Sequence, residues 1–241
     1  MFEYKKINKL PIITKKFNQD KKYSFAMAKK DKIDFVYNTS ALEGNAMTYP
    51  EVQTLLEGIT VGGHKLSDEQ QVLNQNRSVG LLFKMIENST FRVDKKTICE
   101  LHTLVAREEA LYWGEFRDAN VNIGGTDYLP PPAKELNSIF EDGIKNLKLI
   151  KDPIYKALCY FLFGARTQFF FDGNKRTSRL VMNGILLDNG LPILNIKAKD
   201  KLEFNTKMIE FYDSENYIDI LKYLTRYYET QNAHMKILSI I

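Results

Sequence analysis

The amino-acid sequence predicts an all-α protein, a helical bundle with one small β-hairpin. Two apolar segments of helix length, Pro153–Thr167 and Lys175–Asn189, lie on either side of a short glycine-containing turn. Several further segments place apolar residues three and four positions apart, which is typical of helices with one buried face. Only the stretch from Val121 to Leu129 alternates as strands do, around a Gly-Gly pair. This pattern predicts a hairpin.

The composition is that of an ordinary globular protein of 241 residues, 44% hydrophobic and 27% charged. The net charge of +4 arises from 34 basic and 30 acidic residues spread along the chain. This charge is too mild and too dispersed to indicate nucleic acid by itself, and we expect no nucleic-acid partner. No apolar run reaches membrane-spanning length and residues 1–16 lack a secretion signal, so we expect a cytoplasmic protein with no membrane partner. Cys99 and Cys159 lie in apolar helical segments and are expected to be free thiols.

The N-terminal third is expected to be helical. Residues 18–38 mix apolar side chains with lysines at helical spacing, and Gly44 is a plausible stop further along. Pro50 lies near the first turn of another expected helix. Three glycines in residues 58–67 predict a loop, and residues 67–87 form the next expected helix.

The middle of the chain contains one more helix before the expected hairpin. Asp94 is a suitable N-cap for a helix over residues 95–110. His102 lies on this helix, and we expect it to be packed or half-exposed rather than catalytic. None of the three histidines and two cysteines shows the spacing of a zinc site. The hairpin would place Val121 and Ile123 on one arm and Tyr128 and Leu129 on the other.

Five helices are expected in the C-terminal half, over residues 132–149, 153–167, 175–189, 200–212 and 216–234. Asp152 and Pro153 mark the start of the second, which is almost entirely apolar and therefore central. Gly190 is a suitable C-cap for the third. A short extended piece is expected at residues 193–196.

The turn between the two central helices has the residue types of an anion site. Backbone N–H groups at a helix N-terminus favour anions, and Asp172 supplies a hard oxygen for Mg²⁺. Arg176 and Arg179 lie three residues apart, so they share one helix face and can reach successive phosphates. The alternative is a simple helix–turn–helix corner whose basic side chains are solvated. The residue types alone favour neither interpretation.

Residues 168–179 resemble the signature loop of Fic-domain proteins, His-Pro-Phe-x-Asp-Gly-Asn-Gly-Arg-x-x-Arg. The matching residues are Phe170, Asp172, Gly173, Asn174, Arg176 and Arg179. Lys175 replaces a glycine, which is a familiar variant, and Gln168 replaces the catalytic histidine. Fic proteins mostly transfer AMP from Mg-ATP to a Ser, Thr or Tyr hydroxyl of a target protein.

The resemblance covers roughly residues 39–230 and implies a Fic-type bundle. It implies ATP and Mg²⁺ as ligands, with the metal at Asp172 and the nucleotide at Gly173, Asn174, Lys175, Arg176 and Arg179. Residues 1–89 would form an N-terminal helical extension, and residues 90–241 the Fic core, packed as one globular unit.

Two further segments resemble regulatory and docking elements of the family. Thr39 and Glu43, followed by Gly44, resemble the Fic inhibitory motif, whose glutamate pairs with the second arginine of the signature loop. Arg179 occupies that position here. The expected hairpin resembles the Fic flap, so Ile123, Gly124 and Gly125 would dock a target protein segment. The alternatives are a solvated helix end and a surface hairpin that braces two helices.

Gln168 leaves the activity open. An amide can orient a hydroxyl but cannot accept its proton, and losing a general base costs a factor of about 10²–10⁴ in rate. One interpretation is therefore a slow protein adenylyltransferase restrained by Glu43. The other is a non-catalytic Fic relative, a pseudoenzyme that binds nucleotide or a partner protein. A different phosphate-bearing donor, the identity of the target and a homodimer all stay open.

Overall fold

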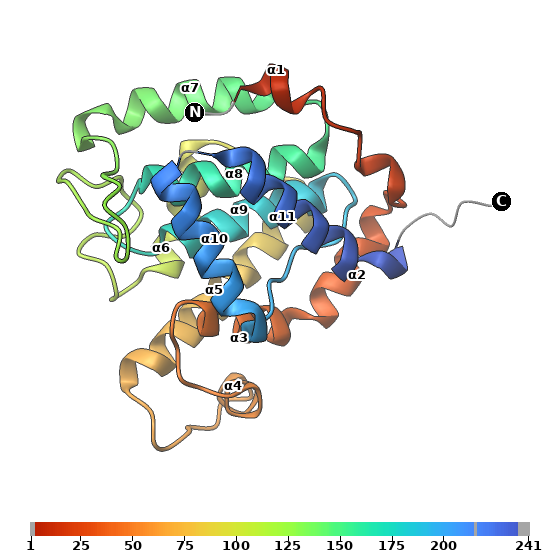
Figure 1. Cartoon of the computed structure of the whole chain (residues 1–241). Helices are drawn as coiled ribbons and strands as arrows, with labels where there is room; N and C mark the ends of the chain where they lie inside the picture. Colours follow the sequence, from red (N-terminus) through yellow and green to blue (C-terminus); the bar gives the residue numbers. More distant parts are fainter. Residues whose placement is uncertain (1–2, 215, 236–241) are drawn as a thin grey trace.

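The computed structural model describes residues 3–214 and 216–235. Its helices are α1 (Tyr4–Ile7), α2 (Lys21–Lys30), α3 (Lys32–Leu42), α4 (Tyr49–Leu56), α5 (Leu66–Glu87), α6 (Lys95–Val105), α7 (Leu136–Lys148), α8 (Pro153–Thr167), α9 (Asn174–Asp188), α10 (Lys201–Ser214) and α11 (Tyr217–Gln231). Figure 1 shows α8 and α9 in the middle of the bundle, with α7 along one edge and α10 and α11 across the front. The all-α prediction is confirmed.

The α8–α9 pair is the centre of the hydrophobic core. Asp152 caps α8, because its Oδ1 accepts a hydrogen bond from Ile154 N at 2.8 Å. The two helices pack closely where Gly164 faces Ser178, since a Cβ at Gly164 would collide with the Ser178 Oγ. Both helices are buried along almost their whole length. The turn that joins them is therefore held by a rigid support.

Two expected helices differ from the structure by a break or by more than a turn, and the helix expected over residues 132–149 begins at Leu136. The helix expected over residues 18–38 is divided at Asp31 into α2 and α3, and α3 continues to Leu42. No proline or glycine marks this break, so the sequence pattern did not signal it. The helix expected over residues 95–110 ends at Val105, and Glu108 beyond it has a positive φ of 63°.

The expected hairpin is absent, because the described residues contain no strand. Residues 121–129 form an irregular loop with its turn at Gly125, which has a φ of 85°. Two hydrogen bonds hold this loop instead: Tyr128 N donates to Thr126 Oγ1 at 3.0 Å within the loop, and Thr126 Oγ1 donates to Asp213 on α10. An isolated two-stranded ribbon is marginally stable in water. Contacts with α10 therefore replace the strand pairing that the alternating pattern predicted.

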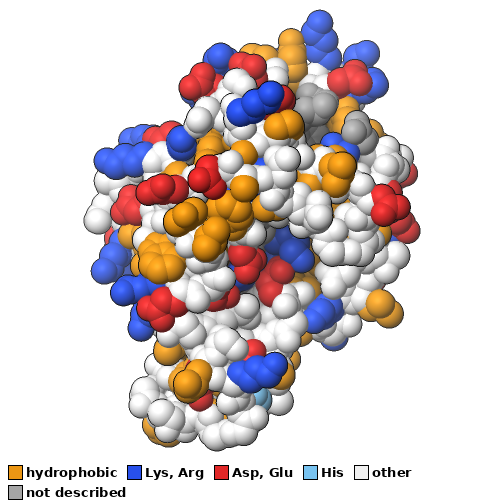
Figure 2. All heavy atoms as spheres, turned by 90° about the vertical axis from the view of Figure 1, so that its left-hand side faces the viewer, with side chains coloured by type: hydrophobic (Ala, Val, Ile, Leu, Met, Phe, Trp, Pro, Cys, Tyr) orange, Lys and Arg blue, Asp and Glu red, His pale blue; other side chains and the backbone are white. Residues whose placement is uncertain are grey.

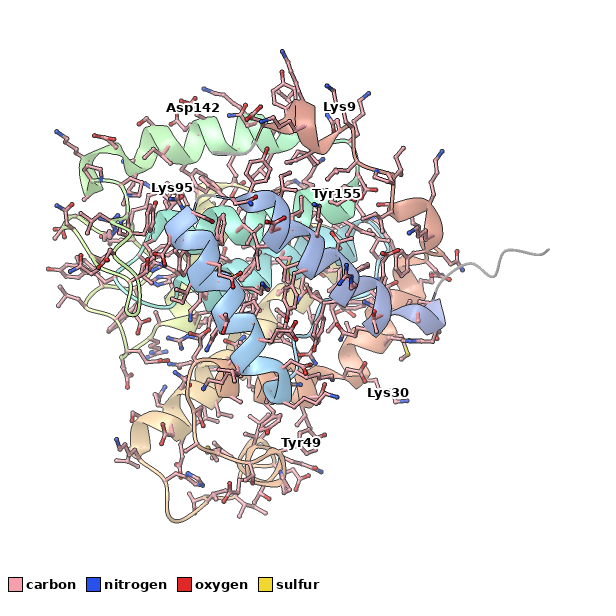
Figure 3. All side chains as sticks on the ribbon, in the orientation of Figure 1. Lys9, Lys30, Tyr49, Lys95, Asp142 and Tyr155 are labelled. Atoms are coloured by element: carbon pink, nitrogen blue, oxygen red, sulfur yellow. The ribbon has the colours of Figure 1, made fainter. Side chains whose placement is uncertain are left out.

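Helix α4 and the loop of residues 57–65 project from the lower end of the bundle (Figure 1). Thr48 and Glu51 form a capping box at the start of α4. Tyr49, labelled in Figure 3, packs edge-to-face on Tyr37 of α3 with ring centroids 5.6 Å apart. Cys99 and Cys159 are free thiols, as predicted. None of the described helices has both the length and the apolar character that a membrane crossing requires.

Candidate functional site

The turn between α8 and α9 is closed by side-chain amides. Gln168 ends α8 in the left-handed conformation, with a φ of 53°. Its Nε2 donates to Ala165 O at 2.6 Å, and its Oε1 accepts from Asn174 Nδ2 at 2.9 Å. Asn174 also bonds both backbone groups of Phe170, at 2.8 and 2.9 Å. Both ends of the Gln168 amide are therefore engaged in holding the turn.

His102 supports the same turn from α6. Its Nδ1 accepts from Gly114 N at 2.9 Å, so its Nε2, which lies 2.9 Å from Asp172 O, carries the proton and donates. The buried ring stacks on Phe170 with centroids 3.6 Å apart. Burial, with a smaller contribution from the nearby charge of Arg176, lowers the pKa of His102 to about 4, against the opposing effect of the hydrogen bond to Asp172 O. His102 is thus packed, as expected, and is a neutral support for the loop.

Arg176 is almost fully buried and is held on one side by Glu109. Its Nη1 lies 2.8 Å from Glu109 Oε2 and donates to Val105 O at 3.2 Å. Its Nη2 lies 3.7 Å from Asp172 Oδ1, whose side chain is 59% exposed. One edge of the guanidinium is therefore fixed to α6 and the loop after it. The other edge faces the exposed carboxylate at the mouth of the turn.

Glu109 is in turn held by amides of α5. Asn74 Nδ2 donates to Glu109 Oε1 at 3.1 Å, and Gln71 Nε2 donates to Glu109 Oε2 at 3.3 Å. Gln71 Oε1 accepts from Asn45 Nδ2 at 3.1 Å. The chain of hydrogen bonds thus runs from the segment after α3 to Arg176. The sequence analysis did not identify Glu109, because no local pattern marks its contacts.

Arg179 lies one turn further along α9 and contacts Glu43 at the end of α3. The Arg179 Nη2 donates to Glu43 Oε1, and Nη1 donates to Thr39 O at 3.5 Å. The second oxygen of the carboxylate, Glu43 Oε2, lies 3.0 Å from Lys175 Nζ. The structure thus brings Thr39 and Glu43 together with Arg179. It adds Lys175 as a second cation on the same carboxylate.

Glu43 is ionised in this environment. Burial alone would raise its pKa, but the positive charges of Arg179, Lys175 and Arg176 outweigh burial and lower the pKa to about 2. Three cations of α9 therefore face two nearly buried carboxylates, those of Glu43 and Glu109.

Arg117 ties the neighbouring loop to the site. It is buried, and it donates to the backbone oxygens of Gln168, Ala119 and Pro131 at 2.6–2.7 Å. The backbone N–H of Arg117 donates to Phe169 O at 2.9 Å. The start and the end of the segment 119–131 are therefore fastened beside Gln168. The sequence analysis gave Arg117 no role.

The three expected docking residues lie within this fastened loop. Ile123 is partly buried and Gly124 is exposed. Gly125 lies against α10, where a Cβ would be 3.4 Å from Ile209 Cδ1. Figure 2 shows the face formed by the left-hand side of Figure 1, with acidic and basic side chains gathered in a hollow near its middle.

The donor set fits Mg²⁺ bound together with phosphate. Within residues 3–214 and 216–235, no three His, Cys, Asp or Glu side chains gather into a metal site of their own. Asp172 is a single exposed carboxylate beside a helix N-terminus, and Mg²⁺ in phosphate sites commonly has one or two protein carboxylates and takes its other oxygens from phosphate and water. The buried Arg179 Nε also has no hydrogen-bond partner among the described residues.

Comparison with known proteins identifies related sequences. The sequence profile of the Fic/DOC family matches residues 92–186. A protein adenylyltransferase Fic from Drosophila willistoni is 30% identical over 70% of this chain and 34% of its own length. The corresponding protein of Aedes aegypti is 27% identical over 71% of this chain and 35% of its own length. The chain thus spans about a third of the length of these curated relatives.

Solved structures show the same fold. Fic-1 (residues 134–508) of C. elegans superposes with a TM-score of 0.77 at 19% identity, covering 96% of this chain and 68% of that one. A Fic domain containing signaling protein from Bacteroides thetaiotaomicron superposes with a TM-score of 0.70 at 20% identity, covering 95% and 88%.

Proposed function

Since the chain carries a Fic/DOC-family domain at residues 92–186, we propose that it binds a magnesium-bound nucleotide at the start of α9. AMP transfer to a protein hydroxyl is weak at most, because Gln168 stands where the family has its catalytic histidine. One observation supports this proposal above all. Lys175, Arg176 and Arg179 lie together at one helix N-terminus, opposite the two nearly buried carboxylates of Glu43 and Glu109. Asp172, 3.7 Å from Arg176 Nη2, is a third and exposed carboxylate, so with Mg²⁺ held at Asp172 the site would have the surplus of positive charge that suits a polyphosphate.

Each residue of the turn has a distinct part in this proposal. Asp172 would hold Mg²⁺, which neutralises charge on the phosphates when bound. The first intrahelical bond of α9 is donated by Thr177 N to Gly173 O at 2.8 Å. The N–H groups of residues 174–176 therefore precede that bond and can donate to phosphate oxygens. Arg176 supplies the guanidinium edge that faces Asp172, and residues 1–89 form the extension whose Glu43 holds Arg179.

Gln168 limits the chemistry of the proposed site. An amide has no nitrogen that accepts a proton near neutral pH. Both ends of this amide also hold the turn, through Ala165 and Asn174. These observations equally favour a second candidate function, a Fic relative that binds nucleotide or a partner protein without transfer. A target segment would dock at residues 121–129, through the backbone around Ile123, Gly124 and Gly125.

Calorimetric titration with Mg-ATP tests the nucleotide site. Asp172→Asn and Arg176→Ala are each expected to weaken binding by about 10- to 100-fold, the value of a hydrogen bond to a charged group. Arg226→Ala is the matched control, because it removes an equal charge from the exposed surface of α11. Circular dichroism verifies that each variant is folded. Unchanged affinity in both site variants contradicts the proposed site.

A second experiment separates the two candidate functions. Wild type, Gln168→His, Glu43→Gly and the double variant are incubated with α-labelled Mg-ATP, and self-modification is measured by intact mass. Transfer is expected to be lowest in wild type and highest in the double variant, because one change supplies a base and the other frees Arg179. No transfer by the double variant, despite measured ATP binding, favours the binding function. A parallel reaction with γ-labelled ATP reports transfer of a terminal phosphoryl group.

A further inference from the structure

The lysines of the N-terminal segment form a large group of charged residues to which the proposed function gives no role. Residues 1–32 contain ten lysines, three acidic residues and no arginine, so this segment has a net charge of +7, whereas the whole chain has +4. The positive charge is therefore less dispersed than the count for the whole chain indicates. We propose that part of this segment, together with the end of α7, forms a surface that binds an anionic phospholipid membrane.

Hydrogen bonds hold the N-terminal segment against the loop between α7 and α8. Asn8 Nδ2 donates to Leu149 O at 2.9 Å, and Asn8 Oδ1 accepts from Lys151 N at 3.0 Å. Further along, Thr14 N and Oγ1 donate to the two carboxylate oxygens of the buried Asp152, at 3.0 and 2.7 Å. Figure 1 accordingly shows α1 beside the C-terminal end of α7. Two segments that are far apart in the sequence therefore form one fixed edge of the bundle.

Five exposed lysines lie in these two segments without an ion pair. Their side chains have no carboxylate partner and no hydrogen bond among the described residues, unlike the neighbouring Lys6, Lys16 and Lys145, which pair with acidic residues. The five, which we call the basic edge, are Lys5, Lys9, Lys15, Lys148 and Lys151. Figure 3 shows Lys9 at the outer limit of the bundle beside α1. Neighbouring unpaired cations repel one another, and an anionic partner relieves that repulsion.

Two aliphatic side chains are exposed among these lysines. Ile12 is 53% exposed and Leu149 is 48% exposed, and both belong to the hydrogen-bonded segments that carry the basic edge. An aliphatic side chain gains free energy when it leaves water for the interface of a bilayer. Lysine stems lie in the same interface, with their charges toward the lipid phosphates. Lysines interspersed with exposed aliphatic residues are therefore suited to an anionic lipid surface.

Nucleic acid is another polyanion that five lysines can contact, and the composition of the basic edge disfavours it. Nucleic-acid sites commonly use arginine for bidentate contacts and aromatic side chains for stacking on bases. The five residues of the basic edge include neither, and the exposed side chains between them are aliphatic. A surface contact with a membrane needs no spanning helix. It therefore differs from the sequence-based expectation of no membrane partner, which rested on the lack of a spanning run and of a secretion signal.

Co-sedimentation of the whole chain with lipid vesicles tests the proposal. Vesicles of phosphatidylglycerol with phosphatidylcholine are compared with vesicles of phosphatidylcholine alone, at about 0.1 M salt, where exposed charges still act over about 10 Å. Combining Lys9→Gln, Lys148→Gln and Lys151→Gln is expected to weaken binding to the anionic vesicles about 100-fold, because each lysine near such a surface contributes about fivefold. Combining Ile12→Ser and Leu149→Ser is expected to weaken it about 10-fold.

The matched control combines Lys65→Gln, Lys84→Gln and Lys96→Gln, which remove an equal charge from exposed positions outside the basic edge. Circular dichroism verifies that each variant is folded. Equal losses in the control and in the basic-edge variant overturn the proposal, because binding would then follow net charge alone. Equal binding to neutral and anionic vesicles also overturns it, as does the absence of binding between the folded wild type and anionic vesicles.

Labelled single-stranded RNA and a labelled DNA duplex replace the vesicles in a parallel titration. If the protein binds either nucleic acid through the lysines of the basic edge and does not bind anionic vesicles, the surface belongs to nucleic acid and the proposal fails. Vesicle binding that both the lysine variant and the serine variant weaken, while the control does not, supports the membrane surface.

Discussion

Arg176 and Arg179 lie three residues apart on α9, and each donates to one carboxylate, yet the two carboxylates are held in different ways. Glu109 lies within the Fic/DOC region, residues 92–186, and also accepts hydrogen bonds from Gln71 and Asn74. Glu43 lies outside that region, at the C-terminal end of α3. Its oxygens contact only side chains of α9 in the hydrogen bonds and ion pairs of the described residues.

This difference separates a permanent contact from a removable one. Displacing Glu109 would remove the carboxylate that accepts from Arg176, Gln71 and Asn74, so the cost is spread over α5 and α9. Displacing Glu43 takes the carboxylate only from the cations Lys175 and Arg179, and a phosphate can replace the carboxylate at those cations. We therefore interpret Arg176 as a fixed part of the site and Arg179 as the part that Glu43 regulates.

The largest expected effect comes from breaking the fixed contact. Glu109→Ala leaves the buried charge of Arg176 without its carboxylate, which costs about 3–5 kcal/mol of unfolding free energy. Urea denaturation at neutral pH measures this loss. Glu87→Ala is the control, because the Lys29–Glu87 pair is exposed and worth at most about 1 kcal/mol. Equal losses in the two variants would show that Arg176 does not need Glu109.

A smaller effect is expected from neutralising the removable contact, and it depends on pH. The pKa of Glu43 is lowered to about 2 in the folded protein. The ionised carboxylate therefore makes its full contribution to the unfolding free energy above the unfolded pKa near 4.5. It is lost as pH falls from there toward 2. Glu43→Gln should therefore cost roughly 3 kcal/mol at pH 7. The unfolding free energies of variant and wild type should converge toward pH 2, and a constant difference contradicts the ion pair.

His102 provides an internal reference for that titration. Because burial lowers its pKa to about 4, the folded protein keeps it neutral where the unfolded chain, with a pKa near 6.5, is protonated. The unfolding free energy should therefore decrease as pH is lowered from 6.5 to 4, in wild type and in Glu43→Gln alike. The two proteins should approach each other only below about pH 4.5, where Glu43 begins to be protonated in the unfolded chain.

The smallest expected effect is on ligand-linked stability. Saturating Mg-ATP should raise the unfolding free energy of Glu43→Gln by about 1 kcal/mol more than that of wild type, because the ligand no longer competes with a charged carboxylate. Glu109→Ala should show no such gain, because Glu109 pairs with Arg176 and the ligand does not compete with Glu109 for that arginine. Thermal melts with and without Mg-ATP measure both differences. A gain in the Glu109 variant and none in the Glu43 variant would reverse our assignment of the two arginines.

The parts of the fold that local signals determine could be predicted from sequence. The predicted bounds of α8, 153–167, agree with the structure because Asp152 and Pro153 mark its start and a turn follows its last residue. The other central helix begins one residue before the predicted position. The segment 121–129 has a strand-like pattern, but its contacts with α10 decide its conformation. A local pattern contains no information about that distant helix.

The same distinction applies to the site. The residues of the signature loop are adjacent in sequence, so their type and spacing were readable. The contacts of Glu109, Arg117 and His102 join residues from separate elements that share no motif. A buried arginine that donates to three backbone carbonyls, as Arg117 does, can be recognised only from the fold.

The hydrogen bonds of Gln168 have an evolutionary consequence. In this loop its side chain gives one hydrogen bond and accepts one, and a neutral imidazole offers the same pair. Glutamine and histidine codons differ only at the third base. One point mutation can therefore interconvert, at this position, a residue that cannot accept a proton near neutral pH and one that can. Loss and recovery of a proton acceptor are each a single mutational step for a gene that encodes this loop.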